Sequence, residues 1–118
     1  MRTVPIALLG SVLVALAACG SSVPPPNTEW EAASNDVGHA ESGGAPNVPD
    51  ARLHLQLARE DLQKSKELIN KDNRRALRLV ELGRAEAQLA LSLAKAQAAQ
   101  DQARQYQADL QKVKGGAQ

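Results

Sequence analysis

The chain has 118 residues, enough for one small domain, and its only aromatic side chains are Trp30 and Tyr106. An Ala-rich core without Phe buries little apolar area, which contributes roughly 25 cal/mol per Å², so the composition favours a slender helical structure over a compact enzyme domain. The formal net charge is only +1, which argues against a nucleic-acid binder.

The first residues have the pattern of a secretory leader. Arg2 gives a short basic start, and residues 4–18 form an apolar run of suitable length. The run is too short to span a bilayer core of roughly 30 Å, which takes about 20 apolar residues. Residues 1–18 are therefore predicted to be a signal peptide. Loss of Arg2 with it would leave a mature chain without net charge.

The end of this leader resembles the bacterial lipobox. Residues 16–18 (Leu-Ala-Ala) place an aliphatic and two small residues before Cys19, the single cysteine of the chain. Small residues fit a peptidase cleft before the scissile bond, and the thiol is the nucleophile that receives the lipid. The resemblance implies a diacylglyceryl thioether on Cys19, cleavage after Ala18 and acylation of the new amino terminus. The alternative is an ordinary buried thiol, and a single cysteine excludes an internal disulfide.

Lipidation at Cys19 would determine where the protein resides. Two or three acyl chains anchor firmly, because each buried CH₂ contributes about 0.8 kcal/mol. In lipoproteins of this kind an Asp after the cysteine tends to retain the protein in the inner membrane. Gly20 occupies that position, so the resemblance implies the outer membrane, facing the periplasm. This inference holds only for a bacterium with two membranes.

Residues 19–27 are predicted to form the lipid anchor and a tether. Three consecutive prolines, residues 24–26, favour an extended polyproline conformation of ~3.1 Å per residue. Such a tether would lift the following domain off the lipid surface.

A helical domain is predicted over residues 28–114, with a disordered tail over 115–118. Its first element is a short helix over about residues 29–42, opened by a capping box of Thr28 and Glu31 and ended by Gly43. The apolar stripe of this helix comprises Trp30, Ala33, Val37 and Ala40.

Two longer helices follow and give an all-α fold. The second opens near Pro49, which a first turn tolerates, and residues 71–73 separate it from a third helix that runs to Lys114, roughly 60 Å. The short break predicts an antiparallel hairpin in which residues 50–70 lie along 74–94. The predicted seam comprises Ala51, Leu55, Ala58, Leu62, Ser65 and Ile69 on one helix, and Ala76, Val80, Gly83, Ala87, Ala90 and Ala94 on the other.

The third helix is too long for its partner, and a second apolar stripe appears on another of its faces. Two interpretations are open: exposed alanine on a helix that needs no partner, or a coiled-coil seam. A seam would be filled by the first helix, by a second copy or by a different protein. The predicted contact residues are Leu89, Leu93, Ala96, Ala103, Tyr106 and Leu110, with Leu82, Ala99 and Val113 extending the stripe.

The two helices of the hairpin share a pattern of small and apolar residues with a known family. The pattern comprises Leu55, Ala58-Arg59-Glu60, Leu62, Ser65, Ala76, Leu79 and Ala85-Glu86-Ala87-Gln88-Leu89-Ala90. It resembles domain-of-unknown-function family 4398, a family of bacterial envelope lipoproteins with an alanine-rich helical hairpin, over roughly residues 30–98. Some relatives join the hairpin to a peptidoglycan-binding domain; the sequence shows none, so wall binding is not implied. The family has no assigned activity, so the resemblance implies location and fold.

Catalytic, cofactor and metal constellations are absent from the sequence. His39 and His54 are isolated and predicted to be structural or solvated. The hairpin tip is the exception to an even charge distribution, because six basic residues face only Glu67 and Asp72. The six basic residues are Lys64, Lys66, Lys71, Arg74, Arg75 and Arg78. They are interpreted either as solvated charge at a tight turn or as a contact with an anionic partner through Lys71, Arg74, Arg75 and Arg78.

Three interpretations of function follow from these features. The favoured one is a structural or adaptor lipoprotein, not an enzyme, that presents a helical surface to a periplasmic protein or to a second copy. The alternative is a non-covalent peptidoglycan-associated tether, comparable to the major outer-membrane lipoprotein. That protein is joined to the wall through its terminal lysine, whereas this sequence ends in Gln118. The third is a small enzyme or its subunit, against which the missing site chemistry argues.

Overall fold

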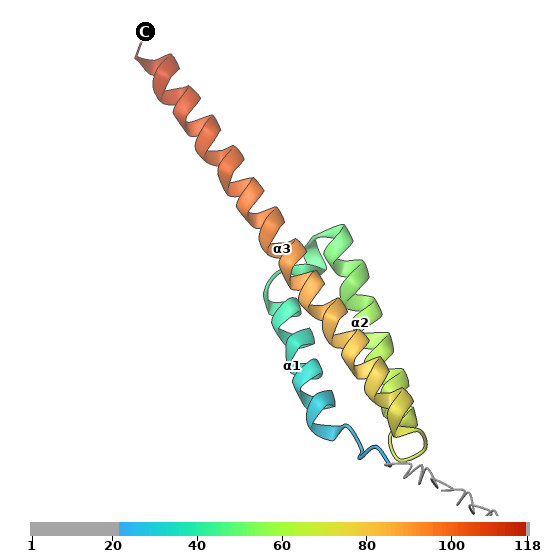
Figure 1. Cartoon of the computed structure of the whole chain (residues 1–118). Helices are drawn as coiled ribbons and strands as arrows, with labels where there is room; N and C mark the ends of the chain where they lie inside the picture. Colours follow the sequence, from blue (N-terminus) through green and yellow to red (C-terminus); the bar gives the residue numbers. More distant parts are fainter. Residues whose placement is uncertain (1–21, 118) are drawn as a thin grey trace, which may run out of the picture.

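A computed structural model describes residues 22–117 of the chain, so the predicted leader, Cys19 and Gly20 lie outside the described residues. The described part is helical, which confirms the all-α class and the long C-terminal helix (Figure 1). Its elements are α1 (Asn27–Ser42), the short 3-10 helix η1 (Ala45–Asn47), α2 (Pro49–Leu68) and α3 (Asn73–Gly116).

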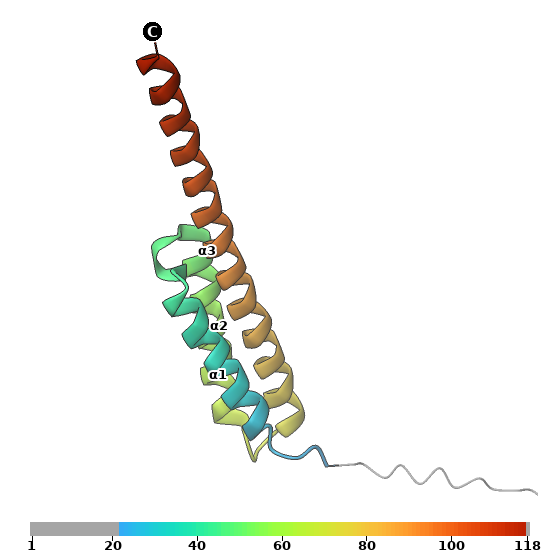
Figure 2. The ribbon, with the colours of Figure 1, turned by 90° about the vertical axis from the view of Figure 1, so that its left-hand side faces the viewer.

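Helix α2 and the first half of α3 lie side by side and run in opposite directions (Figures 1 and 2). Their backbones approach closely, because a Cβ added to Gly83 would lie 3.1 Å from the carbonyl oxygen of Ala58. The small side chains predicted along this seam therefore bury apolar surface at short helix separation. The buried seam residues are Ala51, Leu55, Ala58, Leu62 and Ser65 on α2, and Ala76, Val80, Gly83, Ala87, Ala90 and Ala94 on α3.

Helix α1 packs against both members of the hairpin and completes a bundle of three helices (Figure 2). Its predicted apolar stripe faces inward, with Ala33, Val37 and Ala40 buried. Two ion pairs join it to its neighbours: Glu41 to Arg59 of α2 at 2.6 Å, and Asp36 to Arg84 of α3 at 2.9 Å. Surface ion pairs contribute little to the free energy of folding, so these two orient α1 on the hairpin and add little stability.

The start of α1 differs from the prediction. The capping box of Thr28 and Glu31 is wrong, because Pro26 occupies the N-cap position and no side chain caps the helix. Instead the carbonyl oxygen of buried Pro26 accepts a hydrogen bond from the amide of Trp30 at 3.0 Å. The fixed φ of proline is compatible with helix entry, so the helix begins directly after the proline run.

The turn between α2 and α3 is built from polar side chains. Asn70 adopts a positive φ of 69°, a conformation that asparagine tolerates better than most residues. The Asp72 carboxylate accepts a hydrogen bond from the amide of Arg75 at 3.0 Å and caps α3. Ile69, predicted in the seam, is half-buried at the end of α2.

Helix α3 extends far beyond the bundle. Its 44 residues span about 66 Å, and residues 95–116, here called the overhang, account for about 33 Å of this length. The overhang ends at the opposite end of the molecule from the α2–α3 turn (Figure 1). Within residues 22–117, no helix combines the length and the apolar character needed to cross a membrane.

Candidate contact surfaces

Two side-chain contacts show which face of α3 each neighbouring helix covers. Arg84 forms an ion pair with Asp36 of α1, whereas Glu86 is hydrogen-bonded to His54 Nδ1 of α2 at 2.5 Å. Arg84 and Glu86 are two residues apart and therefore point about 200° away from each other around the helix. Helix α1 thus covers one side of the hairpin and leaves the side of Glu86 without a third helix.

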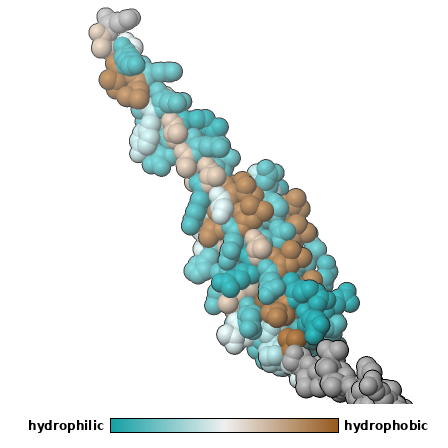
Figure 3. Space-filling model, viewed as in Figure 1, coloured by the Kyte–Doolittle hydropathy of each residue, from teal (hydrophilic) through white to brown (hydrophobic). Residues whose placement is uncertain are grey.

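The second apolar stripe lies on that uncovered side. Leu82 and Leu89 stand four residues before and three residues after Glu86, which places all three side chains on one face. These leucines are 48% and 42% exposed. Leu93, one turn further along, is half-buried against the core. The stripe therefore starts on the hairpin as a partly exposed apolar surface (Figure 3).

The heptad repeat continues along the overhang, where it drifts around the straight helix by about 20° per heptad and is fully open to solvent. Tyr106 and Leu110 are each 61% exposed, Val113 is 70% exposed, and Ala96 and Ala103 are exposed between them and the hairpin. At the base of the overhang, Gln97, Ala98 and Asp101 line a hollow beside η1. Beyond Asp101 every described side chain is exposed and its contacts are local, such as the hydrogen bond from Gln102 to the Tyr106 hydroxyl.

The first helix does not fill this stripe, so one of the three predicted occupants is wrong. The Trp30 indole nitrogen donates a hydrogen bond to the carbonyl oxygen of Leu62, and Lys66 Nζ lies 5.0 Å from the centre of the Trp30 ring. Both contacts hold Trp30 near the α2–α3 turn. The rest of the α1 stripe is buried against the hairpin, so α1 is not free to cover the overhang. A second copy or a different protein remains.

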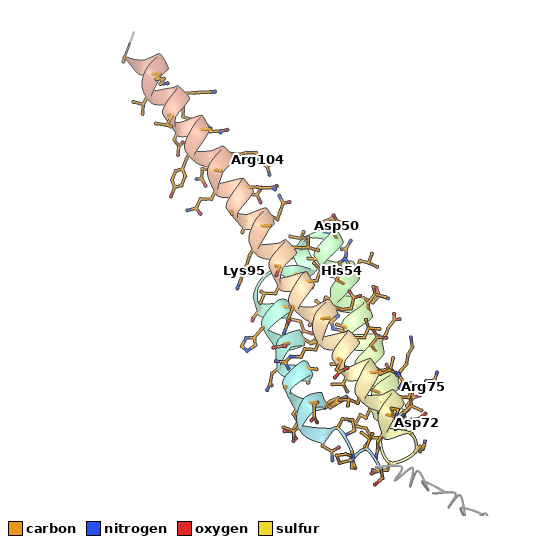
Figure 4. The ribbon with its side chains drawn as sticks, in the orientation of Figure 1. Asp50, His54, Asp72, Arg75, Lys95 and Arg104 are labelled. Carbon is orange, nitrogen blue, oxygen red and sulfur yellow. The ribbon has the colours of Figure 1, made fainter. Side chains whose placement is uncertain are left out.

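The basic residues predicted at the hairpin tip gather around the α2–α3 turn. Lys71, Arg74, Arg75 and Arg78 are all exposed, and no ion pair in the described part of the chain includes them. Figure 4 shows Arg75 beside Asp72 at this turn, with Arg104 at the distant overhang. These four residues are called the basic tip below.

The end of the tether contacts the same turn. The Asn73 side-chain nitrogen donates a hydrogen bond to the carbonyl oxygen of Val23 at 2.9 Å. The other side-chain atom, Asn73 Oδ1, accepts a hydrogen bond from the amide of Asn70 at 2.7 Å. Val23 is half-buried and Pro26 is buried, so this part of the predicted tether is docked on the bundle.

The uncovered side of the hairpin also carries the titratable pair His54 and Glu86, joined across 32 residues. Burial raises the pKa of the nearby Asp61 carboxyl; Lys64 lowers it, and Glu86 and Glu60 raise it further. Within residues 22–117 no group of three His, Cys, Asp or Glu residues could hold a metal ion. An open hollow of about 480 Å³ beside η1 has Asp101 as its only charged lining residue.

Comparison with known proteins gives no relative: no family model, curated protein or solved structure matches this chain. The resemblance to family 4398 therefore stays a prediction. Sequence reasoning missed Asn73 and the pairing of His54 with Glu86, because both depend on partners far away along the chain. The polar residues that interrupt the helical pattern at 70–73 are the one local signal that could have indicated Asn73.

Proposed function

We propose that this chain is a lipid-anchored protein of the bacterial cell envelope with a structural or adaptor role. It presents the apolar stripe of α3 to a helical partner in the periplasm. The observation that carries this proposal is the exposure of Tyr106, Leu110 and Val113 on a helix that leaves its own bundle.

The overhang continues a helix that the bundle has already nucleated. Each residue added to it in water gains little free energy, because the propagation constant is only about 1–1.6 even for good helix formers. The stripe repeats apolar residues at steps of seven, with Ala96, Ala103 and Leu110 in one position of the heptad and Ala99, Tyr106 and Val113 in another. This is the pattern of a seam that buries itself against a second helix. Covering a Leu or Val contributes about 1.5–3 kcal/mol, so a partner would stabilise the overhang directly.

The arrangement of the two ends supports an adaptor role. The tether is docked beside the α2–α3 turn, so an anchor at Cys19 would sit at that end of the molecule. The overhang leaves the bundle at the other end (Figure 1). An anchored protein would therefore carry its exposed stripe tens of ångströms away from the lipid surface, at roughly 1.5 Å per helical residue.

Affinity capture from solubilised envelopes tests this proposal, using the full chain as its source produces it. Leu110→Lys places a charge in the stripe and should abolish capture of the partner. Ala108→Lys is the matched control, because Ala108 is two residues away on the opposite face of α3 and should keep full capture. Equal capture by both variants, or capture by neither the wild type nor Ala108→Lys, contradicts the proposal. Recovery of the chain itself identifies the partner as a second copy.

A further inference from the structure

We infer that the basic tip faces the membrane and binds the anionic phospholipid headgroups of the leaflet that holds the lipid anchor. This inference rests on the proposed lipidation of Cys19. It assigns a partner to the four basic residues Lys71, Arg74, Arg75 and Arg78, which make no ion pair within residues 22–117.

The tether places the basic tip close to the proposed anchor. The hydrogen bond from Asn73 to the Val23 carbonyl holds the tether against the α2–α3 turn. Cys19 precedes Val23 by four residues, which can span at most about 14 Å of fully extended chain. A lipid on Cys19 therefore keeps the turn close to the headgroup layer, and the turn cannot swing far from the surface.

The turn carries positive charge at the start of α3. Arg74 and Arg75 stand in the first turn of α3, where the helix dipole favours acidic residues, and no acidic residue occupies that turn. Asp72 directs its carboxylate to the backbone as the cap of α3. The arginines therefore oppose the helix dipole, and the fold gives no reason for their position. Phosphate recognition gives a reason, because one guanidinium group can donate two parallel hydrogen bonds to the oxygens of a phosphate.

Acidic residues near this end do not cancel the positive charge. Glu31 lines a small hollow together with Lys66 and Trp30, so it offsets Lys66, which already lies over the Trp30 ring. Lys64 interacts with the Asp61 carboxylate, so this pair adds no net charge. Glu29, Glu67 and Asp72 are the other acidic residues of this end, set against the four cations of the basic tip. Each cation close to an anionic leaflet strengthens association by roughly five-fold.

The same geometry favours lipid over peptidoglycan as the anionic partner. The basic tip lies at the tethered end, and the overhang projects from the other end (Figure 1). A polymer distant from the membrane would meet the overhang first. The basic tip is therefore placed for headgroups within reach of the anchor.

Amide hydrogen exchange of the full, lipidated chain on vesicles tests the inference. Vesicles of phosphatidylethanolamine with phosphatidylglycerol supply anionic headgroups, and vesicles of phosphatidylcholine supply neutral ones. We expect the amides of residues 69–78 to exchange several-fold more slowly on the anionic vesicles at low salt. The difference should vanish near 1 M salt, where the screening length falls to about 3 Å.

Charge variants make the test specific. The double variant Arg74→Gln and Arg75→Gln should lose the protection, whereas Arg104→Gln, an exposed arginine of the overhang, should retain it. Equal exchange on both kinds of vesicle overturns the inference. So does binding to purified peptidoglycan that requires Arg74 and Arg75 while vesicles give no protection. Vesicle flotation reports separately on the anchor: a chain that does not float contradicts the proposed lipidation and, with it, this inference.

Discussion

The indole nitrogen of Trp30 donates a hydrogen bond to the carbonyl oxygen of Leu62 at 3.1 Å. This contact joins α1 to α2 across 32 residues and holds the only Trp of the chain near the α2–α3 turn. It commits α1 to the hairpin groove, so α1 is not available to the overhang. The exposure of the α3 stripe is therefore a consequence of how the bundle closes.

The first prediction concerns this contact. Trp30→Phe keeps a ring in place but removes the hydrogen-bond donor, so the free energy of unfolding should fall by about 1 kcal/mol. Urea titration followed by circular dichroism measures the change. Tyr106→Phe is the control, because the Tyr106 hydroxyl contacts only Gln102 on the overhang. An equal effect of the two substitutions would contradict the role given to Trp30.

The second prediction tests the close approach of α2 and α3. Ala87 is fully buried in the seam, whereas Ala85 is exposed on the same helix. Ala87→Leu should overpack the interface and lower the free energy of unfolding by roughly 1–3 kcal/mol. Ala85→Leu should leave it almost unchanged. Thermal melts of the two variants measure the difference, and equal melting temperatures would show that the seam is wrongly placed.

The sequence predicts the residues of the hairpin seam well because they follow one simple rule. The stripe that begins at Ala51 and the stripe that ends at Ala94 keep steps of three and four residues, and helical geometry brings such residues to one face. The break at residues 71–73 then leaves a hairpin as the natural arrangement. The placement of α1 was harder, because its thin stripe fits two surfaces. The contacts of Trp30 and the ion pairs of Asp36 and Glu41, all with distant partners, decide between them.

The tip and tether show what periodicity does not reveal. Asn73 appears in the sequence as part of a helix break, yet its amide joins the turn to Val23 across 50 residues. Contacts of this kind depend on the final position of both partners, so no local pattern indicates them. The capping box at Thr28 failed for a related reason: the docked prolines start α1 earlier than its side chains suggest.

The third prediction uses the perturbed carboxyl of Asp61. Burial raises its pKa above 3.8, so the folded state holds this proton more tightly than the unfolded state. Stability should therefore be reduced above the raised pKa and recover as the pH falls through it toward 3.8. Asp61→Asn should be more stable than the wild type at neutral pH, and the gain should shrink under acidic conditions.

Chemical denaturation at several pH values measures this dependence. Glu81→Gln is the matched control, because Glu81 is exposed and is not among the charges that shift the pKa of Asp61. A gain from Asp61→Asn that is independent of pH, or equal for Glu81→Gln, would show that burial of the Asp61 charge is not its cause.

The fourth prediction is lipidation at Cys19. The intact mass of the mature protein should equal that of residues 19–118 plus acyl groups, and Cys19→Ala should leave an uncleaved precursor without lipid. Mass spectrometry of the protein extracted from membranes measures both. A soluble protein that starts at another residue would contradict the anchor.

The last prediction addresses the central claim, that the α3 stripe is a contact surface in the envelope. A photoreactive amino acid placed at Leu110 in the full chain should crosslink to a partner in intact cells, because Leu110 lies in the exposed stripe. The same group at Ala108, on the opposite face, should give little crosslinked product. A discrete adduct from position 110 that is absent from position 108 is the result this account predicts. Equal crosslinking from both positions, or none from either, would contradict it.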